Sequence, residues 1–159
     1  MKIADADSAE NDSGSKHYVV TPLSCSLPNR REGAPKASGD ERLKIVPDSR
    51  LHSICGSEDH SEQYYCNYGV NEDYEKRFQA AGLRVSACGI QGETRAVELP
   101  DHRFFIATLF QPQLSSRPES PHLFWLAFLK AAMQFQKTRS KRRATRTPAT
   151  KPRARAAAR

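Results

Sequence analysis

The sequence lacks the long apolar runs and the targeting signals that would place a chain in a membrane. No stretch of its 159 residues approaches the roughly 18 to 20 apolar residues that cross a bilayer. The N-terminal segment MKIADADSAENDSG is acidic and polar, without the basic and apolar regions of a signal peptide. We therefore expect a cytoplasmic protein without membrane contact.

Cysteine is scarce, and its spacing excludes the common zinc sites. Cys25, Cys55, Cys66 and Cys88 form no CxxC pair. The sequence also has no internal repeat and no Gly-rich phosphate loop, so we predict no metal and no cofactor. Reduced core thiols are expected. The alternative is a reactive thiol, and Cys66 is its candidate because it interrupts an aromatic strand.

Acidic residues are absent from the C-terminal segment 137–159, which holds 10 of the 25 Lys and Arg residues. The remaining 15 basic and 18 acidic residues give residues 1–136 a net charge of −3, although the whole chain carries +7. A mildly acidic body with a basic tail therefore needs two separate explanations.

The first half of the chain predicts short strands separated by polar segments. Residues 1–17 are small and polar and predict a disordered arm. Apolar or alternating patterns predict strands at 18–27, 43–46 and 62–70, with a surface loop over 28–42.

The second half predicts one capped helix, a hairpin and a buried strand. Asn71 caps the segment EDYEKRFQAAG, and Gly82 suits the position just after its last turn. The segments LRVSACGI and TRAVELP flank QGE as a hairpin. The run FFIATLF, apolar on both faces, predicts a central strand covered on two sides. A last helix is predicted over 121–136.

These elements predict an α/β layered domain with a mixed sheet over 18–136, between a disordered arm at 1–17 and a disordered basic tail at 137–159. The body holds about as many residues as one small domain needs to bury a core of its own.

Four segments occur in a fixed order: TPLSCSL, EQYYCNYGVN, the run from NEDYEKRFQAAG to QPQLSSRP, and PHLFWLAFLKAA. Together they resemble the class I glutamine amidotransferase domain of CTP synthase and related short bacterial proteins. The resemblance covers about residues 18–132. It implies a flavodoxin-like amidotransferase fold, of which this chain would carry the C-terminal half.

Such domains hydrolyse glutamine with a Cys-His-Glu triad, whose last two members follow the buried strand as F-H-P-E. Here that motif reads Phe110-Gln111-Pro112-Gln113. An amide neither takes a proton from a thiol nor returns one to ammonia. No cysteine stands in a G-x-C-x-G elbow either, so this chain alone is predicted to be inactive as an enzyme.

The resemblance also implies substrate contacts at Glu62, Asn67 and Tyr68, although Asn67 replaces the arginine that the family uses to hold glutamine. His102 and His122 match family histidines, for which we favour structural roles. The synthetase half that binds ATP and UTP has no counterpart here. We expect the missing N-terminal half to leave an exposed sheet edge, so that the fragment either pairs with a chain supplying that half or is marginally stable.

The basic tail leaves three alternatives open. Its basic residues, represented by Lys141, Arg142, Arg143 and Arg146, favour weak, non-specific binding to nucleic acid. A solubilising or incidental extension is the second alternative, and a membrane-surface anchor is the third and least favoured. A non-catalytic binding module for an amide or a nucleotide-pathway partner stays open for the body.

Overall fold

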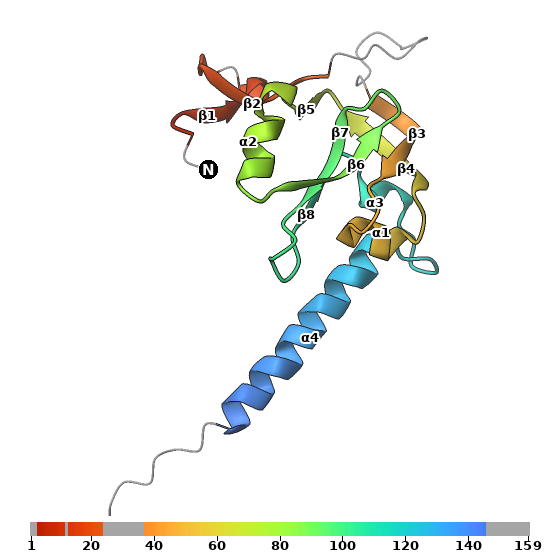
Figure 1. Cartoon of the computed structure of the whole chain (residues 1–159). Coiled ribbons are helices and arrows are strands. Elements are labelled where there is room, and N and C mark those ends of the chain that lie inside the picture. The colour runs from red at the N-terminus through yellow and green to blue at the C-terminus, as the bar shows by residue number, and fades with distance from the viewer. Residues whose placement is uncertain (1–2, 12, 24–36, 146–159) are drawn as a thin grey trace, which may run out of the picture.

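The computed structural model describes residues 3–11, 13–23 and 37–145, which form a mixed α/β fold (Figure 1). A small sheet has the order β1-β2-β5, in which β1 (Ala6–Ser8) runs parallel to β2 (His17–Pro22) and β5 (Tyr68–Val70) runs antiparallel to it. The larger sheet has the order β4-β3-β6-β7-β8, with every neighbouring pair antiparallel.

The strands of the larger sheet are β3 (Ala37–Ile45), β4 (Asp59–Cys66), β6 (Arg84–Gly89), β7 (Thr94–Glu98) and β8 (Ile106–Thr108). The α-helices are α1 (Arg50–Cys55), α2 (Glu75–Ala80), α3 (Pro112–Ser115) and α4 (Leu123–Thr145), and two short 3₁₀ turns, η1 (Ala9–Asn11) and η2 (Glu72–Tyr74), complete the fold.

The core lies at the centre of the larger sheet. Consecutive residues of a strand point to opposite faces, and Arg95 and Ala96 of β7 are both buried. The sheet is therefore covered on both sides at β7. The buried apolar residues are contributed mainly by β3, β4, β6, β7 and α1: Leu43, Ile45, Leu51, Tyr64, Ala87, Ala96 and Phe110.

The predicted capped helix and the predicted hairpin are confirmed. The side chain of Asn71 accepts a hydrogen bond from the backbone N–H of Asp73, and the helix continues through η2 into α2. Gly82 follows with φ +86°, a conformation that a residue with a Cβ rarely adopts. Strands β6 and β7 form the hairpin at the predicted place.

The prediction of a central strand at FFIATLF is wrong, because β8 has three residues and ends the sheet. The apolar segment before β8 packs against a helix instead. The ring of Phe104 lies 5.8 Å from that of Phe124 and 5.5 Å from that of Phe128, both on α4. An apolar run indicates contact with other apolar residues, but it does not show whether a strand or a helix provides that contact.

Three further boundaries differ from the predictions. The segment predicted as one strand at 62–70 is divided at Asn67, and its parts, β4 and β5, belong to different sheets. Strand β3 begins inside the predicted loop 28–42, and helix α1 was not predicted at all. The two strand boundaries depend on pairing partners distant in sequence, which a local pattern does not show. Helix α1 does carry local signals, since the side chain of Ser49 accepts from the N–H of His52 and Gly56 follows with φ +75°.

Both predicted disordered ends contain regular structure. Within 1–17, β1 pairs with β2, with Ala6 opposite His17. Helix α4 continues through Lys, Arg and Ala residues, which favour helix, nine residues past its predicted end at 136, so 137–145 is helical. Residues 146–159 lie outside the described part of the chain, as do 24–27 of the strand predicted at 18–27.

The start of α1 is held by a buried carboxylate on β7. Glu98 is 1% exposed, and its oxygens accept hydrogen bonds from the backbone N–H groups of Arg50 and Leu51. The guanidinium of Arg84 lies 2.9 Å from the same carboxylate. A negative charge there complements the positive end of the helix dipole.

We expect Glu98→Ala to lower the free energy of unfolding by about 1–3 kcal/mol, because it leaves two helix N–H groups without their acceptor and the partly exposed Arg84 without its ion partner. Urea denaturation followed by circular dichroism measures the change. Glu119→Ala, at an exposed glutamate, is the control and should shift the midpoint little. Equal midpoints for the two variants would contradict this role for Glu98.

Candidate functional site

The turn after β8 brings Gln111 against the end of β4. Its backbone N–H donates to the carbonyl of Gln63 at 2.8 Å, and its side-chain Nε2 donates to the carbonyl of Tyr65 at 3.1 Å. Pro112 is buried and opens α3. The amide of Gln111 therefore acts as a tie between two backbone segments.

Gln113 lies on α3 and is exposed. Its side chain makes no hydrogen bond with the described residues. The two positions at which the resemblance implies the base and its orienting carboxylate thus hold one amide bound to a carbonyl and one facing solvent. Neither group titrates near neutral pH, so this pair cannot transfer a proton.

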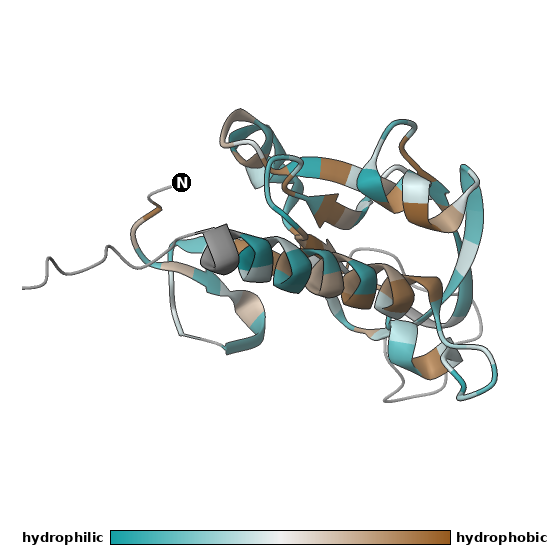
Figure 2. Ribbon diagram, turned by 90° about the horizontal axis from the view of Figure 1, so that it is seen from below, coloured by the Kyte–Doolittle hydropathy of each residue, from teal (hydrophilic) through white to brown (hydrophobic). Residues whose placement is uncertain are grey.

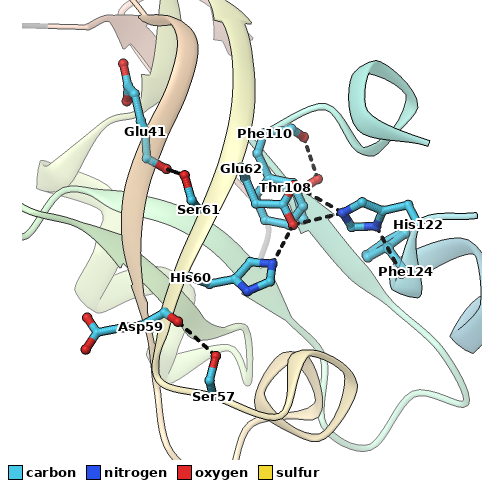
Figure 3. A network of polar contacts seen from close by, with 10 residues as sticks. All are labelled: Glu41, Ser57, Asp59, His60, Ser61, Glu62, Thr108, Phe110, His122 and Phe124. Carbon is cyan, nitrogen blue, oxygen red and sulfur yellow. Dashed lines mark hydrogen bonds and ion pairs between the residues drawn. The ribbon is translucent and has the colours of Figure 1, made fainter. Parts of the chain in front are cut away.

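A buried carboxylate on β4, Glu62, lies between two histidines (Figure 3). Glu62 is 3% exposed, and its Oε1 lies 3.0 Å from Nε2 of His60 and 2.9 Å from Nε2 of His122. Burial alone would raise the pKa of Glu62, but the hydrogen bonds from His122 and His60 outweigh burial and hold this pKa below its usual value.

His122 connects this carboxylate to the start of α4. Its Nδ1 lies 3.1 Å from the backbone N of Phe124, which donates to it, and this assigns the ring proton to Nε2, facing Glu62. One imidazole thus caps a helix and binds a buried anion. His102 has a comparable local role, since its Nδ1 accepts from the backbone N–H of Phe104.

Tyr68 lines a separate cavity of about 250 Å³ between β5, β7 and β8. Cys66 and Leu109 also line it, whereas Glu62 and Asn67 do not. The backbone carbonyl of Asn67 accepts from the N–H of Leu23. The structure therefore does not gather the three predicted substrate contacts around one cavity, and their role in binding stays a prediction.

The described cysteines are free thiols. Burial, with a smaller contribution from Glu62, raises the pKa of Cys55 to about 11, and burial also raises the pKa of Cys88. The thiol of Cys66 lies 3.0 Å from the carbonyl of Tyr68. None of these three thiols is hydrogen-bonded to a histidine, and Cys25 lies outside the described residues.

One buried ion cluster was not found from the sequence. Arg95 lies 3.1 Å from Glu41 and 2.6 Å from Glu93, and its guanidinium lies 4.9 Å from the ring centre of Tyr64. Burial raises the pKa of Glu41, and the charge of Arg95 opposes that rise. Because Arg95 already has two carboxylate partners, the cluster joins strands and leaves no uncompensated positive charge for a ligand.

The basic tail is described only in part. Lys141 is exposed on α4, as are Lys137 and Arg139. The side chains of Arg142 and Arg143, and all of Arg146, lie outside what the structure describes. Among the described residues, no group of three or more potential metal ligands is arranged to hold an ion, and no helix has the length and apolarity to cross a membrane.

No protein-family model matches the chain. The chain is 33% identical over 135 residues to the CTP synthase of Archaeoglobus fulgidus and 38% identical over 136 residues to that of Caldivirga maquilingensis. Each match covers 84% of this chain and 25% of the relative. The chain therefore spans about a quarter of the length of these curated relatives.

The fold superposes on the glutaminase domain of Trypanosoma brucei CTPS with bound acivicin, with a TM-score of 0.72 and 30% identity. This match covers 82% of the present chain and 52% of the solved one. About half of that domain thus has no counterpart in the superposed residues.

The lowered pKa of Glu62 predicts a pH-dependent contribution to stability. Because the folded pKa is below the unfolded value of 4.5, the contribution is fully present above about pH 4.5 and is lost as the pH falls through the folded pKa. We expect Glu62→Gln to lower the free energy of unfolding by about 1.5–3 kcal/mol at pH 7. Its deficit should shrink below pH 4.5, as measured by urea denaturation across pH.

Glu119→Gln is the matched control for this series, because Glu119 is exposed and should give no comparable pH-dependent difference. A deficit of Glu62→Gln that grew as the pH fell from 4.5 to 3 would contradict the sign of the pKa shift.

Proposed function

Since the chain is homologous to part of the glutaminase domain of CTP synthases, we propose that it is a non-hydrolytic form of that domain, which does not release ammonia from glutamine by itself. The observation that carries the proposal is the hydrogen bond from the Gln111 side chain to the carbonyl of Tyr65 at 3.1 Å. The position to which the resemblance assigns a base is occupied by a structural amide.

Glutamine hydrolysis by a thiol needs a base that removes the thiol proton and later returns it to the leaving ammonia. The base must in turn be oriented, which is the part the resemblance assigns to a carboxylate at 113. Replacing a triad base lowers turnover by on the order of 10⁴ to 10⁶. The thiols of Cys55 and Cys88, whose pKa values are raised, offer no activated nucleophile in compensation.

Binding of glutamine is also weakened under this proposal. A guanidinium holds a carboxylate with two charge-assisted hydrogen bonds, whereas the amide at Asn67 carries no charge. Tyr68 still lines a cavity of about 250 Å³, which keeps a non-catalytic binding role for the body within the proposal. The proposal also includes a place in pyrimidine nucleotide metabolism. It includes a cytoplasmic location, which agrees with the three free thiols of the described residues.

We expect the purified chain to release no ammonia from glutamine above the background of a heat-denatured sample, with an intact CTP synthase as positive control. A coupled glutamate dehydrogenase assay measures the glutamate formed. The double variant Gln111→His, Gln113→Glu should stay inactive as well, because no cysteine of this sequence stands in a G-x-C-x-G elbow. Turnover by the unaltered chain at rates typical of intact relatives would overturn the proposal.

A second candidate function rests on the exposed cations of α4. Lys137, Arg139 and Lys141 extend from its C-terminal half, and such residues bind phosphate backbones by releasing counterions. The tail contains no aromatic residue that could stack on bases. The binding would therefore be salt-dependent and without sequence preference, with a Kd of about 10⁻⁴ to 10⁻⁶ M.

We expect the triple variant Lys137→Gln, Arg139→Gln, Lys141→Gln to weaken binding to duplex DNA. It should also reduce the slope of log K against log salt by up to about 0.9 per removed contact. Fluorescence anisotropy at several salt concentrations measures both. The matched control, Arg42→Gln, Lys44→Gln, Lys76→Gln, removes the same charge from exposed positions elsewhere. Equal binding of DNA by the two triple variants would show that α4 is not the DNA-binding element.

A further inference from the structure

The two edges of the larger sheet differ in how they are covered. At β4, the backbone and side-chain amides of Gln111 donate to the carbonyls of Gln63 and Tyr65. At β8 the sheet order ends, and β7 is the strand that pairs with it among the described residues. Figure 1 shows β8 at this side of the body, close to where α4 begins.

The hydrogen bonds beside β8 show which of its backbone groups face outward. The N–H of Leu99 donates to the carbonyl of Phe105, and the N–H of Leu109 donates to that of Arg95. Because bonding groups alternate along an antiparallel pair, Ala107 also faces β7. Ile106 and Thr108 therefore direct their N–H and C=O groups to the open edge, where they form a template for another strand.

Helix α4 carries an apolar surface that continues past this edge. At 100° per residue, its apolar side chains between 124 and 135 occupy about 260° of the circumference. The narrow polar stripe holds Lys130, Gln134, Lys137 and Lys141. Along its axis, α4 is mainly hydrophobic at its N-terminal end and more hydrophilic toward its C-terminal end (Figure 2). A helix that is apolar nearly all round is one that other elements cover.

The open edge and the helix surface are continuous. One groove of about 240 Å³ is lined by Phe105 and Ile106 at the start of β8 and by Phe124, Trp125 and Phe128 of α4. A strand added beside β8 would therefore place its side chains directly above α4. We call the outward groups of β8 together with the exposed apolar face of α4 the open face.

The open face is large enough for a stable interface. Seven large apolar side chains of α4 are 39% to 57% exposed. Side chains of this size present about 150–250 Å² when free, so the helix alone exposes on the order of 600 Å² of apolar residues. That is the upper limit of patches on monomeric proteins and approaches the roughly 800 Å² per partner of a standard interface.

The occupant follows from the superposition on the solved glutaminase domain. Nearly half of that domain is unmatched, yet it folds as one unit with the matched part. Its unmatched part must pack on surfaces that the matched part leaves open. On the described chain, the open face combines a strand with one unpaired edge and a broad apolar surface. We infer that it docks a polypeptide carrying that unmatched part of the glutaminase fold, which adds a strand to β8 and covers α4.

This inference rests on the proposed function, and its test separates the two. The unmatched part of the glutaminase domain from the Archaeoglobus fulgidus relative serves as probe, co-expressed with the full chain. We expect a one-to-one complex by size-exclusion chromatography with light scattering. Hydrogen exchange should slow at least tenfold at Ile106, at Thr108 and along 123–135.

Two matched pairs of variants test the contacts. Thr108→Pro removes an outward N–H, while Thr108→Val removes the hydroxyl and keeps that N–H. Met133→Glu places a charge on the apolar face, and Gln134→Glu places one on the polar stripe. We expect the first member of each pair to weaken the complex at least tenfold and the second to change it less than threefold.

Several outcomes would overturn the inference. They are the absence of a complex, a complex that all four variants leave unchanged, and a homodimer of the chain alone that Thr108→Pro and Met133→Glu disrupt, which would make a second copy the occupant. Ammonia release by the unaltered chain would instead refute the proposed function. That result would not change the conclusion drawn from the docking experiment.

Discussion

The arrangement of this fold depends on one buried anion, the carboxylate of Glu62. It receives hydrogen bonds from His60 on its own strand and from His122, whose other ring nitrogen caps α4. A carboxylate that is 3% exposed must have such partners, because an unpaired buried charge costs several kcal/mol. The requirement sets where α4 begins. Glu98 does the same for α1, so α1 and α4 both start close to a buried acid.

The turn at Gln111 shows how an amide holds the end of a strand in place. An amide offers a donor and an acceptor but no proton equilibrium near neutrality. At Gln111 the donor binds the carbonyl of Tyr65, and the adjacent N–H binds that of Gln63, so the strand end stays fastened to β4. The contact that positions this turn therefore does not depend on proton transfer. The fold does not need a histidine at position 111 to be stable.

The same turn explains why the two sheet edges differ. The bonds from Gln111 occupy the β4 edge at Gln63 and Tyr65, whereas the outward groups of β8 have no partner strand among the described residues. Beside β8, α4 presents apolar side chains that the body of the chain only half covers. Both features face the same groove. Polar groups that are paired within the chain stabilise one edge of the sheet. At the other edge, an exposed apolar patch marks a surface that another polypeptide can cover.

Local patterns were sufficient for the helix at Asn71 and the β6–β7 hairpin, because capping and turn residues depend on neighbours in sequence. They failed where distant partners decide. The apolar run at 104–110 became an edge strand beside α4, on which Phe104 packs, and Glu62 lies 2.9 Å from His122, a contact that no local pattern shows. The sequence by itself determined that the side chains at 111 and 113 are amides, which cannot titrate near neutral pH in any fold. Only the tertiary structure decided which strand is left open, because strand order follows from contacts between segments far apart in the chain.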